Sequence, residues 1–82
     1  MKKFEFENEE LNYLIGMKIK KLRKLKGLTG QQLSEVFNIS QQQISRYERG
    51  INGVNINFLS KLSFFFKVPI DFFLKEDERN QS

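Results

Sequence analysis

Cysteine and histidine are both absent from this chain of 82 residues. Their absence removes thiol nucleophiles, disulfide bonds, zinc fingers and imidazole acid–base chemistry together. Acidic residues occur near both ends, but none stands in a metal-loop spacing, and the sequence has no glycine-rich phosphate cradle. The sequence therefore predicts a protein that is not an enzyme and that requires no metal, cofactor or small-molecule ligand.

Long apolar runs are also missing. No stretch approaches the roughly 20 apolar residues that cross a bilayer, and acidic residues follow Met1 where a signal peptide requires an apolar segment. We therefore expect a cytoplasmic protein with no membrane partner. A single domain of this size has a small core and limited stability, so a dimer would be unsurprising.

Acidic charge is scarce in the middle of the chain. Residues 16–67 contain ten Lys and Arg but only two Glu, a net charge of +8, whereas each flank carries a net charge of −2. A basic centre of this density is typical of proteins that bind a polyanion.

The apolar residues that are present recur at helical spacing and predict an all-α fold of five helices. The first helix is expected from about Glu9 to just before Gly27, and the second from Thr29, with Gln32 in the capping-box position, to Asn38. The expected inner faces of these two helices consist of Leu11, Leu14, Ile15, Ile19, Leu22, Leu25, Leu33, Val36 and Phe37.

The third helix is the most informative segment. Ser40 can cap its start, with Gln43 reaching back to the Ser40 N–H, and Gly50 follows its end. Ile44 and Tyr47 share one face and should be buried. The opposite face consists of Gln41, Gln42, Ser45, Arg46 and Arg49. Because the link from the second helix is only a tight turn, the two helices should form a helix-turn-helix.

A fourth helix is expected from Asn55 to about Phe66, and a short fifth helix after Pro69. The predicted organisation is thus a flexible N-terminal arm at 1–8, a helix-turn-helix domain at 9–74 and a disordered polar tail at 75–82. Within the arm, Phe4 and Phe6 are large enough to dock on the domain or on a second subunit.

The stretch from Ile19 to Leu74 resembles the Cro and lambda-repressor type of helix-turn-helix, also called the xenobiotic-response-element (XRE) family. The matching residues are Leu22-Arg23, Gly27-Leu28-Thr29, Leu33-Ser34, Ile39-Ser40, Ile44-Ser45, Tyr47-Glu48, Gly50, Leu59, Leu62 and Val68. The resemblance implies a DNA-binding transcriptional regulator that is associated with the nucleoid when bound. The sequence departs from the family pattern at Gly30, where a phosphate-clamping glutamine is usual, and at Val54, where a proline is usual.

The resemblance also implies roles for individual residues. The residues expected to read bases are Gln41, Gln42, Arg46 and Ser45, and those expected to contact phosphate are Ser40, Thr29, Gln31, Arg23, Arg49 and Gln43. These roles agree with the chemistry, because a glutamine amide can pair with adenine N6 and N7 and an arginine fork with guanine O6 and N7. Arg23 and Glu48 match a pair that ties the first helix to the third. The lysine run between Lys18 and Lys26 is by default a solvated helix face, with phosphate contact by one of its members as the alternative.

Two adjacent phenylalanine pairs, Phe64-Phe65 and Phe72-Phe73, present their rings in divergent directions, so at least one ring should reach the surface. We therefore expect a homodimer formed by the fourth and fifth helices, with Phe65 and Phe72 as the leading candidates for the contact and double-stranded DNA as its partner.

The hypothesis is a homodimeric repressor of an inverted-repeat operator. The third helix is also similar to that of regulators from bacterial fimbrial operons that repress motility genes. Two alternatives stay open: an antitoxin-type protein that binds a partner protein, and a restriction-modification controller.

Overall fold

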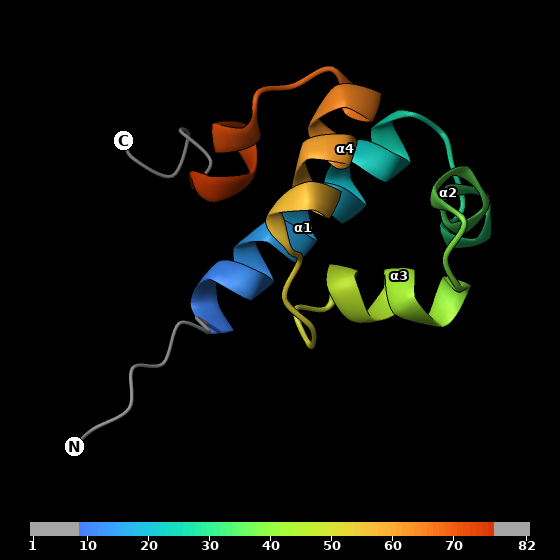
Figure 1. Cartoon of the computed structure of the whole chain (residues 1–82), viewed down its shortest axis with the longest axis horizontal. Helices are drawn as coiled ribbons and strands as arrows, with labels where there is room; N and C mark the ends of the chain where they lie inside the picture. Colours follow the sequence, from blue (N-terminus) through green and yellow to red (C-terminus); the bar gives the residue numbers. More distant parts are fainter. Residues whose placement is uncertain (1–8, 77–82) are drawn as a thin grey trace.

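The computed structural model describes residues 9–76 of the chain. It contains four α-helices, α1 (Glu9–Leu25), α2 (Gly30–Phe37), α3 (Gln41–Glu48) and α4 (Ile56–Phe66), followed by the 3-10 helix η1 (Ile70–Leu74) (Figure 1). The prediction of five α-helices was therefore wrong at the last element. Pro69, at the start of η1, provides no side-chain cap, and five residues are too few to form a stable α-helical segment on their own.

The ends of α2 and α4 follow the sequence signals. The Thr29 hydroxyl accepts a hydrogen bond from the N–H of Gln32, and the Gln32 side chain accepts one from the N–H of Thr29, so the predicted capping box is confirmed. Asn38 ends α2 in the left-handed conformation, with φ of 58°. The Asn55 side chain accepts a hydrogen bond of 2.8 Å from the N–H of Phe58 and caps α4 as expected.

The core lies where α1, α2, α3, α4 and η1 meet. Its fully buried apolar residues are Ile15, Ile19, Leu33, Ile44, Leu59, Leu62 and Phe73. Three residues expected on the inner faces are exposed instead: Leu25 retains 75% of its accessible surface, Val36 48% and Leu11 36%. Periodicity identifies the apolar side of a helix, but the packing of the neighbouring helices decides how wide and how long the covered stripe is.

Within residues 9–76, no helix combines the length and the apolar character that crossing a membrane requires.

Candidate nucleic-acid interface

Helix α3 has one buried and one exposed face. Ile44 retains 1% of its accessible surface, and the half-buried ring of Tyr47 stacks on Phe58 with 5.2 Å between the ring centroids. On the other face, the side chains of Gln41, Gln42 and Arg46 are exposed, and none of them hydrogen-bonds to another residue of the described range 9–76. Three of the four side chains predicted to read bases are therefore accessible and make no hydrogen bond within residues 9–76.

Two glycines allow the end of α3 to lie directly on α1. A Cβ atom at Gly16 would lie 2.3 Å from the carbonyl oxygen of Tyr47, and one at Gly50 would lie 2.8 Å from the Cα of Tyr13. Gly50 also has a φ of 76°, which favours glycine. Gly50 was predicted from the sequence as a helix end, whereas the close packing at Gly16 was not predicted. The available signal was a glycine inside an otherwise regular helical pattern, which often marks a close packing contact.

The predicted pair of Arg23 and Glu48 forms and joins α1 to the last turn of α3. Arg23 Nε donates to Glu48 Oε2 at 2.6 Å and Nη2 donates to Oε1 at 3.1 Å, while Nη1 donates to the carbonyl oxygen of Leu28 at 2.8 Å. Both side chains are largely buried. The hydrogen bonds that Arg23 donates to the Glu48 carboxylate raise the pKa of Arg23 above its ordinary value, so the guanidinium stays charged. Every nitrogen of Arg23 has a partner within the protein, which gives this residue a structural role; its predicted contact with phosphate would have to use the remaining Nη hydrogens.

The N-terminus of α2 lies next to the first residue of α3. A Cβ atom at Gly30 would lie 3.9 Å from both Cγ and Nε2 of Gln41. Gln31 is exposed beside it, and the hydroxyl of Thr29 serves as the helix cap. The structure thus brings two predicted phosphate contacts, Thr29 and Gln31, close to a predicted base-reading side chain.

The remaining predicted contacts on α3 are partly engaged within the protein. The hydroxyl of Ser40 accepts from the N–H of Gln43 at 3.0 Å, but Gln43 does not complete a capping box; its Nε2 donates instead to Asn52 Oδ1 at 3.2 Å. That part of the capping prediction was wrong, because the hydrogen bond to Asn52 holds the Gln43 amide toward the loop after α3 and away from the Ser40 N–H. Arg49 Nε donates to the hydroxyl of Ser45 at 3.2 Å, which leaves the Ser45 hydrogen and the Arg49 Nη groups for a ligand.

One lysine of the basic run is not solvated. Lys18 retains 3% of its accessible surface, its Nζ donates to the carbonyl oxygen of Phe72 at 3.1 Å, and it lies 4.3 Å from the centroid of the Phe72 ring. The sequence signal for this burial is its position three residues after Ile15 and next to Ile19, on the apolar side of α1. Lys18 therefore holds η1 against α1 and is removed from the candidate phosphate contacts, whereas Lys20, Lys21, Lys24 and Lys26 are exposed.

The four phenylalanines proposed for a dimer interface do not share one surface. Phe73 is fully buried in the core of the single chain, so it belongs to the fold and not to an accessible surface. Phe72 is half-buried beneath Lys18. Phe64 is 86% exposed and Phe65 is half-buried beside it. Adjacent residues on short helices point in different directions, and the packing of η1 decided which ring entered the core.

Comparison with known proteins agrees with this architecture. The sequence model of the helix-turn-helix family HTH_3 matches residues 19–73. The chain therefore belongs to the XRE-type helix-turn-helix family of transcriptional regulators. The relatives of this chain are DNA-binding regulators, a non-enzymatic class.

Two relatives and one solved structure illustrate the similarity. An uncharacterised helix-turn-helix transcriptional regulator of Rickettsia prowazekii is 36% identical over 67 residues, which cover 82% of this chain and 52% of that protein. The transcriptional activator BcrR of Enterococcus faecalis is 39% identical over 61 residues, which cover 74% of this chain and 30% of that protein. The DNA-binding domain of BldD from S. venezuelae superimposes with a TM-score of 0.70 and 26% identity, covering 80% of this chain and 99% of that domain. The chain spans about half the length of the first curated relatives it matches.

Proposed function

We propose that this chain is a sequence-specific transcriptional repressor that acts as a homodimer on an inverted-repeat DNA operator. The observation that supports the proposal is the composition of the exposed face of α3: Gln41, Gln42 and Arg46 project from a helix whose other side is fixed by Ile44 and Tyr47. These are the side chains that pair with adenine and guanine edges in the major groove.

Affinity and discrimination would come from different groups. The exposed lysines of α1, the polar residues at the start of α2 and Arg49 would contact phosphates, so binding should weaken steeply as the salt concentration rises. The amide and guanidinium groups of α3 would supply the preference for particular bases. Two copies of α3 in successive major grooves would lie roughly 34–36 Å apart, which predicts an inverted repeat with half-sites about one helical turn apart.

A direct test is selection of duplexes from a random library by the full chain. The expected product is an inverted repeat with half-sites about 10 base pairs apart from centre to centre. Enrichment of a single half-site would contradict the homodimer, and recovery of random sequence would contradict base reading.

Genome-wide binding and reporter assays would place the protein in its cellular context. We propose that it acts in the cytoplasm at the nucleoid and lowers transcription of its target genes. The relative BcrR is named as an activator. A reporter gene whose expression rises when this chain is expressed would show activation and contradict repression. A link between fimbrial expression and motility rests on the resemblance of the 40–50 segment alone, and binding sites at flagellar promoters would support it. A stoichiometric toxin partner would instead favour the antitoxin alternative, and neighbouring methyltransferase and endonuclease genes the restriction-modification controller.

A further inference from the structure

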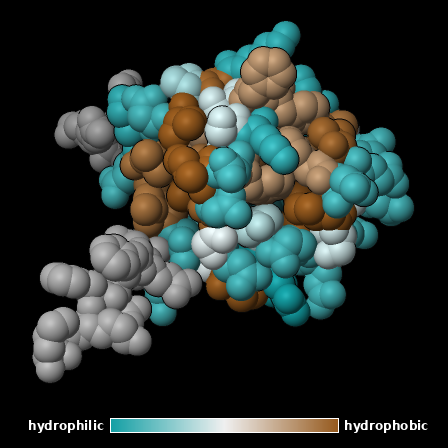
Figure 2. Space-filling view, viewed as in Figure 1, coloured by the Kyte–Doolittle hydropathy of each residue, from teal (hydrophilic) through white to brown (hydrophobic). Residues whose placement is uncertain are grey.

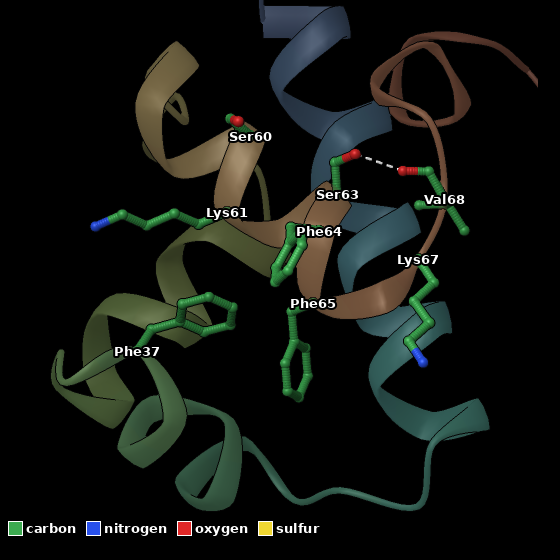
Figure 3. A pocket seen from close by; sticks show the side chains of 8 residues that line it. All are labelled: Phe37, Ser60, Lys61, Ser63, Phe64, Phe65, Lys67 and Val68. Carbon is green, nitrogen blue, oxygen red and sulfur yellow. Dashed lines mark hydrogen bonds between the residues drawn. The ribbon is translucent and has the colours of Figure 1, made fainter.

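An open apolar groove lies between the end of α2 and the last turns of α4, with a volume of about 850 Å³. Its residues are Phe37, Ser60, Lys61, Ser63, Phe64, Phe65, Lys67 and Val68 (Figure 3). Phe64 is 86% exposed, and the half-buried Phe65 meets Phe37 edge to face, with 5.4 Å between the ring centroids. An exposed ring beside further apolar surface is typical of a binding site for another polypeptide.

The groove faces away from the candidate DNA interface. In Figure 1, α3 lies along one side of the molecule and the last turn of α4 lies on the opposite side. In the space-filling view, hydrophobic side chains lie in several groups among hydrophilic ones, on more than one side of the molecule (Figure 2). A segment bound in this groove would therefore leave Gln41, Gln42 and Arg46 accessible.

The rim of the groove is basic. Lys61 and Lys67 are exposed and extend on opposite sides of the three rings (Figure 3), and Nζ of Lys26 lies 5.4 Å from the centroid of Phe65. Among the described residues that line the groove there is no acidic side chain. Packing two copies groove to groove would therefore bring lysines together from both copies, which is electrostatically unfavourable. The chemistry favours an occupant that carries both rings and carboxylates.

The sequence of this chain contains such a segment. Phe4-Glu5-Phe6-Glu7 alternates rings and carboxylates, and an extended backbone places alternate side chains on opposite sides. Residues 1–8 lie outside the described part of the chain. We propose that the occupant of the groove is residues 4–7 of a second copy, with Phe4 and Phe6 against Phe64 and Phe65 and the two carboxylates toward the rim lysines.

Such an exchange is reciprocal, because each copy has one groove and one segment. It satisfies two-fold symmetry without bringing the basic rims together. This inference rests on the proposed homodimer and deepens it by assigning the contact to a segment and a groove.

The first test is a charge exchange in the full chain, measured as the dimer dissociation constant by sedimentation. Lys61→Glu with Lys67→Glu should weaken self-association about tenfold or more, Glu5→Lys with Glu7→Lys should do the same, and all four changes together should restore much of it. Lys20→Glu with Lys24→Glu makes the same change of net charge on α1 and should leave association unchanged. Thermal unfolding of each variant checks that the fold is retained.

The second test depends on the absence of cysteine from the chain, which allows a spin label to be attached at one introduced cysteine. A spin label on Lys3→Cys in unlabelled protein is mixed with nitrogen-15 protein of natural sequence, so that broadening reports contacts between copies only. We expect broadening of the amides of residues 64–68 and of Phe37. The two experiments distinguish failure of the groove assignment from failure of the homodimer. If the protein is a dimer and neither pair of charge substitutions changes its dissociation constant, only the groove assignment is wrong. If the protein is a monomer, the homodimer is wrong as well. Loss of association on Phe64→Ala without any effect at Glu5 and Glu7 would indicate groove-to-groove packing and would overturn the assignment.

Discussion

Replacing Gly16 with alanine is the sharpest test of how α3 is positioned. The added Cβ would lie 2.3 Å from the carbonyl oxygen of Tyr47 and 2.7 Å from that of Glu48, whereas real Cβ contacts below 3.0 Å essentially do not occur. The two helices must therefore separate by about 0.7 Å at this point, the shortfall between the 2.3 Å contact and that limit. Both obstructing atoms belong to the backbone of α3, so no side-chain rotation can relieve the contact.

The expected energy follows from two opposing effects. Overpacking of this kind costs about 1–3 kcal/mol, and alanine recovers about 0.5–1 kcal/mol because glycine is a poor residue for a helix interior. The net loss of unfolding free energy should be about 1–2 kcal/mol, which for a domain of this size lowers Tm by roughly 5–15 °C. Because the separation falls at the end of α3, affinity for the cognate operator should fall by more than affinity for random duplex.

Two other glycines provide matched controls, measured by the same thermal and urea unfolding experiments. A Cβ at Gly30 meets nothing closer than 3.9 Å, so Gly30→Ala should change the unfolding free energy by less than about 0.5 kcal/mol. At Gly27 nothing lies within 4 Å but φ is 75°, so Gly27→Ala should cost about 1 kcal/mol from backbone conformation alone. If the Gly16→Ala variant is as stable as the Gly30→Ala variant, the backbones of α1 and α3 do not pack against each other at Gly16.

Three further substitutions test the interface itself. Arg46→Ala should cost about 1–3 kcal/mol on the selected operator and relax preference at one base position, and equal loss on cognate and random duplexes would show that Arg46 contacts only phosphate. Arg49→Ala should weaken binding to all sequences alike and reduce the salt dependence by about one phosphate contact, measured by titrations at several salt concentrations; a change in base preference would contradict this assignment. Glu48→Ala leaves Arg23 largely buried without its charge partner, so urea unfolding should show a loss of about 3 kcal/mol, and a loss below about 1 kcal/mol would mean that solvent replaces the carboxylate.

The sequence was a reliable guide wherever local chemistry determines the structure. A side-chain oxygen at the start of a helix, as at Thr29, Ser40 and Asn55, competes only for nearby N–H groups, and the left-handed helix ends at Asn38 and Gly50 depend on local backbone preference. The pair of Arg23 and Glu48 was predicted because many residues match the XRE family pattern, and in that family the residues at these two positions contact each other. The polar face of α3 could also be predicted, because helical spacing within one short segment determines which side chains share a face.

Only the tertiary structure decided features that depend on how separate helices meet. The packing of Phe73 into the core, the exposure of Phe64 and the contact of the buried Lys18 with Phe72 all depend on where η1 and α4 lie, and no spacing within one segment contains that information. The diversion of the Gln43 amide to Asn52 likewise required the loop after α3 to be in place. Local sequence thus determined which helices form and which face of α3 is polar, because those depend on neighbours a few residues apart. Contact between distant segments determined how closely α3 approaches α1 and which apolar side chains of α4 remain exposed.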